Sequence, residues 1–391
     1  MDVKRIETPY FLIKEELLEH NIESYRRALK ELWSNSIIAY SVKTNSLPWI
    51  LKWMNNHEVY AEVVSDEEYK LALLSGYSDD RIVFNGPIKT GKYLKKAFNG
   101  GAVLNIDSRF ELDYIIKEKP SFNGPIGIRV NVNPNIFNPD DVGYQEDGFR
   151  FGFSEENGEL SKALDSLKNA SGNTRIGLHM HVNSITRSVN VYRAIAKYAA
   201  DIIIKHSLQP AYIDIGGGFF GGVPGKATPL EYIGAIKREL EKAVSPENTQ
   251  LIIEPGSAFI GSAMELHTSV LDVKDTSHGR IVTTDGSRIY IDPLWKKNNY
   301  LYTIETTGAL FHRQVICGYT CMDHDRIMVI ENKPELHVGD RIVYHRVGNY
   351  TVTFGGPFIR PNPPVYSMNE DEIKLVRKQM TVEEYYRMET V

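Results

Sequence analysis

The first two-thirds of the chain alternates short apolar runs with segments in which apolar residues recur every three or four positions. Eight apolar runs have the pattern of buried strands, at residues 37–42, 59–65, 81–86, 102–107, 125–132, 175–182, 211–217 and 251–256. Helical patterns separate most of them, for example at 47–55 and 66–76. Eight strand–helix units in series predict an α/β fold, the (β/α)8 barrel. A doubly wound sheet is the rival, but it usually has fewer strands.

Residues 133–152 break this rhythm with a long polar stretch that is rich in proline and glycine. A loop of this length in a compact domain is usually a lid or a binding loop. After about residue 262 the pattern changes to short alternating segments, which predict strands. They lie at 269–275, 279–286, 313–321, 326–332, 341–347 and 349–355. We therefore expect a barrel at 30–262 and a β-rich domain made of 1–29 and 263–391.

Composition is that of an ordinary globular protein: 42% of the 391 residues are hydrophobic, 24% are charged and the net charge is −5. Interspersed charges argue against nucleic acid or an anionic membrane as a partner, because both require a basic patch. No apolar run approaches the roughly 20 residues of a membrane span, and no signal peptide is recognisable. Cys317 and Cys321 cannot form a disulfide framework, so we expect a reducing, cytoplasmic compartment.

Residues that carry chemistry follow the predicted strands, at the end of a barrel where active sites gather. In chain order they are Lys43, Glu62, Ser65, Arg129, His179, His181, Asn183, Ser184, Gly216, Gly217, Gly218 and Glu254. Strand alternation places Ala39, Ser41 and Lys43 on one face, and small residues suit a crowded barrel interior. We therefore expect Lys43 to point into the barrel mouth, although a lone strand-end lysine more often reaches water.

Each of these features has more than one interpretation. Three glycines just past a strand either make a tight turn or point backbone amides at an anion such as phosphate. His179 and His181 are metal ligands, core histidines or partners of an aromatic ring, and no further His or Cys cluster completes a metal site. Glu254 pairs with a cation of the protein or with a protonated ring nitrogen. Pyridoxal 5'-phosphate has an aldehyde, a pyridine ring and a phosphate, so it would use all of them at once.

With these residues in place, the chain resembles the fold-type III pyridoxal-phosphate decarboxylases, the group of diaminopimelate, ornithine and arginine decarboxylases. The resemblance runs from TPYF at residue 8 to FIRP near residue 361, and the motifs occur in the family's order. The segments that carry it are YSVKTN, EVVSDEEY, HMHVNS, GGGF, EPGS, CMDHD and GNYT. It implies the alanine racemase-like fold of type III, in which a TIM-like barrel is joined to an all-β domain.

The resemblance also implies a role for each cofactor residue. Lys43 would form the Schiff base with pyridoxal phosphate, His181 would stack on its ring and Glu254 would hold its ring nitrogen protonated. The remaining cofactor-binding positions are Glu62, Ser184, Gly216, Gly217, Gly218 and Tyr350. No metal is implied.

The catalytic residues implied by the resemblance are Lys43 and Cys321, either of which would return a proton to the carbon after CO2 has left. The implied substrate-binding positions are Arg129, Asp285, Met322, Asp325 and Phe358. Members of the family are homodimers whose active sites lie at the interface, with the cysteine segment supplied by the partner subunit. The resemblance thus implies a carboxy-lyase that acts on a small amino-acid substrate.

Several positions depart from the family pattern. Ser257 replaces the arginine of EPGR, and Met322 stands where relatives carry an acidic residue that grips the distal amine. Asp292 begins DPLW, in place of the RPxxY that binds the distal end of diaminopimelate. Asn183 and Glu62 replace a glycine and an aspartate. We therefore expect neither diaminopimelate nor ornithine to be the preferred substrate, and expect instead a modified or conjugated amino acid of specialised metabolism.

Three other functions stay open from the sequence. The first is a racemase of the same fold, although a racemase tends to pair the ring nitrogen with an arginine and not with a glutamate such as Glu254. The second is a non-catalytic homologue that binds a partner, against which the presence of both Lys43 and Cys321 argues. The third is a metal-dependent barrel hydrolase that uses His179 and His181.

Overall fold

The computed structural model of the chain describes residues 5–118, 124–171, 175–297 and 299–390. The chain divides into two compact units, Asn21–Ala258 and a second that joins Met1–His20 to Phe259–Val391. The predicted domain limits, 30 and 262, stay a prediction. Within the described ranges, no helix combines the length and the apolar character that a bilayer crossing requires.

The first unit is a closed barrel of parallel strands, as the alternating pattern predicts. Its strands are β2 Ser36–Ser41, β3 Tyr60–Val63, β4 Ile82–Phe84, β5 Val103–Ile106, β6 Ile126–Asn131, β8 Gly177–His179, β9 Tyr212–Asp214 and β10 Gln250–Ile253. They run in the order β5–β4–β3–β2–β10–β9–β8–β6, and β6 pairs with β5 to close the ring. The two-residue strand β7 Phe153–Ser154 adds to β6. The predicted barrel, with all eight of its strands, is therefore confirmed.

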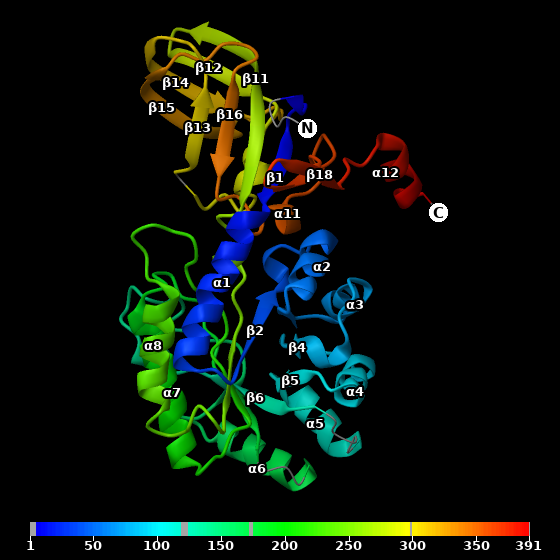
Figure 1. The fold of residues 1–391 in the computed structure, drawn as a ribbon, viewed down its shortest axis with the longest axis vertical. Coiled ribbons are helices and arrows are strands. Elements are labelled where there is room, and N and C mark those ends of the chain that lie inside the picture. The colour runs from blue at the N-terminus through cyan, green and yellow to red at the C-terminus, as the bar shows by residue number, and fades with distance from the viewer. Residues whose placement is uncertain (1–4, 119–123, 172–174, 298, 391) are drawn as a thin grey trace. The chain divides into compact units, whose positions relative to one another are not determined.

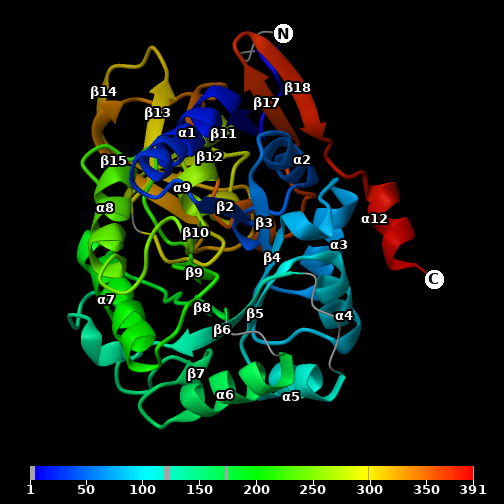
Figure 2. The same cartoon turned by 60° about the horizontal axis from the view of Figure 1, so that its bottom comes forward.

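Helices connect successive strands and lie around the outside of the barrel. They are α1 Glu15–Leu32, α2 Pro48–Asn56, α3 Asp66–Leu74, α4 Gly91–Gly100, α5 Arg109–Glu118, α6 Glu159–Ser171, α7 Val189–Lys205, α8 Pro229–Leu240 and α9 Ser257–Ile260. Figure 2 shows α3 to α8 surrounding the strands. The start of α8 illustrates the local cause, because Thr228 and Glu231 form a capping box and Pro229 occupies the first helical turn.

An apolar layer fills the barrel interior on the side nearer the amino ends of the strands. It is one buried cluster, drawn from five strands, of Ile37, Ala39, Val83, Val103, Tyr212 and Ile252. The tyrosine needs space on β6 and β8, since a Cβ on Gly127 would lie 2.2 Å from the Tyr212 hydroxyl and one on Gly177 would lie 2.3 Å from its ring. Two strand glycines thus allow one large side chain to fill the barrel.

A polar layer follows, nearer the carboxyl ends of the strands. Each barrel strand contributes one residue to this layer, two positions after residues 39, 60, 83, 103, 127, 177, 212 and 252; these are Ser41, Glu62, Asn85, Asn105, Arg129, His179, Asp214 and Glu254. Residues two apart on a strand share a face, so these side chains also point inward. Hydrogen bonds from Asn85 to Glu254 and from Asn105 to Asp214 join strands that are not neighbours in the sheet. The polar side chains therefore meet inside the barrel.

The second unit contains a mixed sheet, which Figure 1 shows together with its small helices. Its elements are β1 Tyr10–Lys14, β11 Met264–Thr276, β12 Gly279–Thr284, α10 Arg288–Ile291, β13 Leu301–Glu305, β14 Leu310–Cys317, β15 Arg326–Pro334, β16 Arg341–His345, α11 Thr351–Phe354, β17 Val365–Asn369, β18 Glu372–Arg377 and α12 Val382–Glu389. The strand order is β15–β14–β12–β11–β1–β17–β18, and β16 pairs with both β11 and β13. β1 runs parallel to β17, and β12 runs parallel to β14.

The strand predicted at 349–355 is wrong, because this segment forms the short helix α11. Tyr350 caps the helix in a left-handed backbone conformation, with φ of 61°. The Thr351 hydroxyl donates a hydrogen bond back to the Val347 carbonyl oxygen, which favours a turn over an extended chain. The β-branched residues of this segment suggested a strand, and local hydrogen bonding overrode that preference.

Candidate active site

Lys43 lies just past β2, in the turn Val42–Thr44 at the carboxyl end of the barrel. Its Nζ donates to Glu62 Oε2 at 2.6 Å, and the Ser41 hydroxyl donates to the same oxygen at 2.6 Å. The Lys43 side chain is 38% exposed, whereas that of Glu62 is 1% exposed. Lys43 therefore reaches from the rim toward the interior, as strand alternation predicts.

Glu62 is an anion in this arrangement. Burial raises the pKa of its carboxyl, but the Lys43 ammonium and hydrogen bonds from Lys43, Ser41 and Asn85 outweigh burial and lower the pKa below its usual value. A buried carboxylate that accepts these hydrogen bonds stays ionised only with a cation close to it. Glu62 therefore holds the Lys43 amino group at the barrel mouth.

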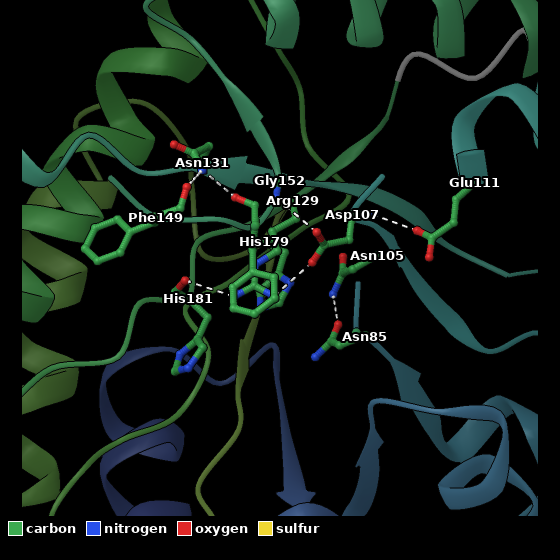
Figure 3. A network of polar contacts seen from close by, with 12 residues as sticks. Asn85, Asn105, Asp107, Glu111, Arg129, Asn131, Phe149, Gly152, His179 and His181 are labelled. Carbon is green, nitrogen blue, oxygen red and sulfur yellow. Dashed lines mark hydrogen bonds and ion pairs between the residues drawn. The ribbon is translucent and has the colours of Figure 1, made fainter. Parts of the chain in front are cut away.

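Neutral amides connect Glu62 to a second carboxyl across the barrel. Asn85 Nδ2 donates to Glu62 Oε1 at 3.1 Å and also to Glu254 Oε1. Asn105 Nδ2 donates to Asn85 Oδ1 at 2.8 Å and to Asp214 Oδ2 at 3.1 Å, and Figure 3 shows the contact between the two amides. The amides thus fix three carboxyl groups in place without neutralising any of them.

Glu254 is 3% exposed, and among the described residues no lysine or arginine forms an ion pair with it. Burial, followed by the charges of Asp214 and Glu62, raises the pKa of Glu254 well above its usual range. Burial likewise raises the pKa of Asp214 to about 6. Buried carboxyl groups this close favour a shared proton or an added cation. A protonated ring nitrogen placed beside Glu254 would supply that positive charge.

His179 cannot supply the charge. Its Nε2 lies 3.8 Å from Glu254 Oε2, which is too long for a hydrogen bond. Burial, followed by the charge of Arg129, holds the pKa of His179 well below its usual value, so its ring is neutral. Atoms of His179, Asp214 and Glu254 lie within 4.8 Å of one another, so this trio is closer to a metal-binding arrangement than the sequence-based pair of His179 and His181.

His181 presents a second neutral ring, parallel to that of His179. The ring centroids are 6.4 Å apart and the planes differ by 13°. Burial, then the charges of Arg129 and Lys43, lower the pKa of His181 to about 3. Among the described residues, His181 Nδ1 and both ring nitrogens of His179 have no hydrogen-bond partner. A neutral imidazole face of this kind is suited to stacking on an aromatic ring.

Gly216, Gly217 and Gly218 follow β9 at a place where the backbone approaches its neighbours too closely for a side chain at Gly216 or Gly217. A Cβ on Gly216 would lie 2.4 Å from the His181 ring, and one on Gly217 would lie 2.1 Å from the Glu254 carbonyl oxygen. Gly216 and Gly218 have φ values of 71° and 90°, which residues with a side chain rarely adopt. Backbone turned in this way can direct amides toward an anion. The carboxyl groups, the neutral His181 ring and the glycine backbone fit pyridoxal phosphate.

Two serines that sequence reasoning singled out have local partners. The Ser184 hydroxyl donates to the Asp141 carbonyl oxygen at 3.1 Å and accepts from the Arg187 amide at 2.8 Å. It therefore ties the segment after β8 to the loop 133–152. Ser65 caps α3, where its hydroxyl accepts from the Glu68 amide at 3.1 Å. A phosphate contact by Ser184 stays a prediction.

The second unit holds the other predicted site residues, which are Asp285, Cys321, Met322, Asp325, Tyr350 and Phe358. Cys321 is exposed in the turn between β14 and β15. Asp325 is 2% exposed and accepts from Thr320 Oγ1 at 2.7 Å, Ser287 Oγ at 3.0 Å and the Arg288 amide at 2.9 Å. Asp325 therefore orders the turn that carries Cys321, and its contact with substrate stays a prediction.

Asp285 and Phe358 also have partners within the second unit. Asp285 accepts from the Thr8 hydroxyl at 2.5 Å and from the Ser269 amide at 2.8 Å, and burial raises the pKa of its carboxyl. Phe358 has a side chain that is 43% exposed, and its carbonyl oxygen accepts from the Tyr319 hydroxyl at 3.1 Å. Their substrate roles, like the roles of Met322 and Tyr350, stay predictions.

Sequence reasoning missed the residues that hold the site together. Asn85, Asn105, Asp107 and Asp214 are all buried and fix the carboxyl and guanidinium groups around them. The signal that could have found them is positional. Three of them lie two residues after an apolar position of a strand, at the level of the polar layer, so comparing the eight strands layer by layer would have predicted them.

Known proteins match both the barrel and the whole chain. The family model described as the pyridoxal binding domain of pyridoxal-dependent decarboxylases matches residues 18–261. The chain is 28% identical to a probable chloroplastic diaminopimelate decarboxylase of Oryza sativa subsp. japonica, over 97% of this chain and 79% of the relative. It is 27% identical to the diaminopimelate decarboxylase of Archaeoglobus fulgidus, over 89% of this chain and 84% of the relative.

Solved structures show the same fold. The diaminopimelate decarboxylase of Helicobacter pylori, complexed with L-lysine, is 25% identical with a TM-score of 0.84, and the match covers 99% of this chain and 98% of that one. The enzyme of M. jannaschii, also complexed with L-lysine, has a TM-score of 0.85 at 22% identity, over 98% and 92% of the two chains. The family match spans more than half of the chain and includes Lys43, His181 and Glu254. The chain therefore belongs to the pyridoxal-dependent decarboxylases, the carboxy-lyases whose cofactor is pyridoxal 5'-phosphate.

Proposed function

We propose that the chain decarboxylates an amino acid with a modified distal end, with Lys43 as the lysine that binds the cofactor and Glu254 as the partner of its ring nitrogen. The observation that carries the proposal is the pair of buried carboxyls held by Asn85. Glu62 is paired with Lys43, whereas burial and neighbouring carboxyls raise the pKa of Glu254. A cationic ring nitrogen would complete the charge balance of the site.

The protein's side chains have separate tasks in this reaction. When bound, pyridoxal phosphate accepts the electron pair that the departing CO2 leaves on the substrate's α-carbon. Glu254 would hold the ring nitrogen protonated, and His181 would stack on the ring and keep water from it. Lys43, with Glu62 as its counter-ion, would hold a proton at Nζ for return to the substrate carbon. We assign Cys321 as the alternative proton donor.

The assembly is part of the proposal. In the family that this chain resembles, the cysteine segment reaches the active site from the partner subunit. Cys321 is exposed on a turn that Asp325 orders, which supports a role in contacts beyond its own unit. We therefore propose a homodimer in which Cys321 serves the site of the partner chain.

The distal end of the substrate is where we expect this chain to differ from its relatives. Asp292 is 4% exposed and stands where the resemblance would place an arginine that binds the distal end of diaminopimelate. Arg288 is already engaged within the chain, because its Nη2 donates to Asp292 Oδ2 at 3.0 Å and its guanidinium lies 4.7 Å from the centroid of the Trp295 ring. It therefore does not take the role of that arginine. Tyr300 also donates to Asp292, at 3.2 Å. This pattern supports a substrate other than diaminopimelate.

The test measures CO2 release by the cofactor-loaded protein from meso-diaminopimelate, L-ornithine, L-arginine and a series of Nε-acyl-L-lysines. We expect release from at least one acylated lysine to exceed release from diaminopimelate, and we expect Lys43→Ala to abolish it. Equal or faster turnover of diaminopimelate would overturn the substrate proposal and leave the decarboxylase. Loss of optical rotation without CO2 release would identify a racemase instead.

A further inference from the structure

Three inward-facing side chains on adjacent barrel strands converge in the polar layer. His179 ends β8, Asp214 ends β9 and Glu254 directly follows β10. The three strands are neighbours in the sheet, and His179 is the register partner of Asp214. Neighbouring strands bring inward side chains of one layer within reach of one another. One ligand atom from each residue lies within 4.8 Å of the other two, and we name these three residues the barrel trio.

The two carboxyl groups of the barrel trio are held in fixed orientations. Asp214 Oδ1 accepts from the Gly216 amide at 2.9 Å, and Asp214 Oδ2 accepts from Asn105 Nδ2 at 3.1 Å. Glu254 Oε1 accepts from Asn85 Nδ2, whereas Glu254 Oε2 accepts no hydrogen bond from the described residues. Hydrogen bonds of this kind orient the carboxylates that bind metal ions. Side chains on strands also hold a ligand geometry better than side chains on loops.

His179 faces these carboxyl groups as a buried polar side chain without a partner. It is 2% exposed, and neither of its ring nitrogens has a hydrogen-bond partner in the part of the chain that the structure describes. Its Nε2 lies 3.8 Å from Glu254 Oε2. Zinc ligands lie about 2.0–2.2 Å from the ion, so two ligand atoms of a tetrahedral site are about 3.3–3.6 Å apart. A shift of a few tenths of an ångström would therefore bring both atoms to one ion.

The charges around the barrel trio favour a divalent cation. The lysines and the arginine that face His179 each have a carboxylate of their own, in the pairs Lys43–Glu62, Arg129–Asp107 and Lys89–Glu111. Within the described ranges, no lysine or arginine forms an ion pair with Asp214 or Glu254. When both are ionised, these two carboxyl groups carry two buried negative charges that lack a counter-charge. One divalent ion supplies the positive charge that balances them.

We propose that the cofactor-free protein binds one divalent metal ion of the zinc type at the barrel trio, and that this ion and pyridoxal phosphate exclude each other. The exclusion rests on the proposed function, which assigns Glu254 to the ring nitrogen of the cofactor. The ion takes no part in decarboxylation, because it occupies a residue that the cofactor needs. One imidazole and two carboxylates suit zinc, whereas Mg²⁺ requires octahedral oxygen ligands and keeps several of its waters. Loading of the chain with cofactor would then depend on the concentration of free metal.

The first measurement titrates zinc sulfate into the full-length protein after the cofactor and residual metal have been removed. Calorimetry gives the affinity, and we expect a site for one ion per chain that magnesium chloride does not fill. His179→Asn should weaken zinc binding by about tenfold or more, because changes around a metal ligand already cost that much. Glu254→Gln should do the same and provides a second variant. His206→Asn is the matched control, because His206 Nε2 also lies near a glutamate, 3.0 Å from Glu155 Oε1, and it should keep the affinity.

The second measurement follows the uptake of pyridoxal phosphate, through its visible absorbance, with and without zinc. With zinc at about ten times its dissociation constant, the apparent affinity of the wild-type protein for the cofactor should fall about tenfold. The same zinc concentration should have much less effect on His179→Asn. This comparison also removes any effect of zinc on the free cofactor, which would be the same for both proteins.

The two measurements separate failure of the metal site from failure of the proposed function. An absence of zinc binding, or zinc binding that His179→Asn and Glu254→Gln leave unchanged, would overturn the metal site. Zinc binding that depends on both residues, together with cofactor uptake that zinc does not affect, would support the metal site. That result would overturn the mutual exclusion and, with it, the assignment of Glu254 to the cofactor.

Discussion

Replacing Lys43 with alanine should make the stability of the chain depend strongly on pH. Lys43 Nζ lies 2.6 Å from Glu62 Oε2, and the Lys43 charge is what offsets the effect of burial on the Glu62 carboxyl. In Lys43→Ala, burial raises the pKa of Glu62 above its unfolded value. The folded state then favours the protonated acid, so stability is kept at low pH and lost as pH rises through the new pKa.

Glu68 provides a scale for the loss, because burial and the charge of Glu62 raise its pKa from 4.5 to about 7. If the pKa of Glu62 reaches a similar value in Lys43→Ala, the rise from 4.5 to about 7 corresponds to about 3 kcal/mol of lost stability at pH 8. At pH 5 the same shift costs only about 1 kcal/mol, because the unfolded carboxyl is then only partly ionised. The difference between the two pH values is the predicted quantity.

The assay is urea unfolding of wild type and Lys43→Ala at pH 5 and pH 8, with both proteins freed of cofactor. The double variant Lys43→Ala/Glu62→Gln is the control, because it lacks the titrating carboxyl, so its loss of stability relative to wild type should be the same at both pH values. A loss of stability in Lys43→Ala that is the same at both pH values would refute the reasoning, since it would mean that Lys43 does not set the ionisation of Glu62.

Three further predictions concern the carboxyl groups, the glycines and metal ions. Burial raises the pKa of Asp214 to about 6, so the protonated carboxyl is stable at pH 5 and the buried anion destabilises the fold at pH 8. Asp214→Asn should therefore raise the melting temperature of cofactor-free protein at pH 8 but not at pH 5. An equal change at both pH values would count against a carboxyl that burial destabilises when it is ionised. Gly216→Ala should weaken cofactor binding by about tenfold or more, because its Cβ would meet the His181 ring. Gly225→Ala is the control and should not weaken it, since Gly225 has a similar φ of 73° and open space around it. Equal cofactor retention by the two variants would contradict a role for Gly216 in placing His181 against the cofactor. Dialysis against a chelator should leave CO2 release unchanged, and a loss that zinc restores would favour the metal-dependent alternative.

The barrel was predictable because its cause is local and repeated. Each strand needs only a short apolar run, and eight such runs separated by helical patterns have few other solutions. The helix α11 was not predictable in the same way, since the Thr351 hydroxyl bonds back to the Val347 carbonyl oxygen and no periodicity reports that contact. The pairing of β1 with β11 and β17 joins residues far apart in the chain, and a single sequence carries no signal for it.

The candidate site was partly predictable for a similar reason. Lys43, His181 and Glu254 stand out because charged or ring side chains are unusual at the ends of apolar strands. The roles of Asn85 and Asn105 depend on which strands face one another across the barrel, and amides are common enough to pass unnoticed in a sequence. The loop 133–152 was identified as a binding loop, whereas the contacts that fasten it to the barrel, such as the hydrogen bond from Asn131 Nδ2 to the Phe151 carbonyl oxygen, required the structure.

The most direct test of the account is to locate the lysine that carries the cofactor. The loaded protein is reduced with borohydride, digested and analysed by mass spectrometry for the peptide that bears the phosphopyridoxyl group. We expect one modified residue, Lys43. Modification of a different lysine, such as the buried Lys89 that pairs with Glu111 at 3.1 Å, or no modification at all, would contradict it.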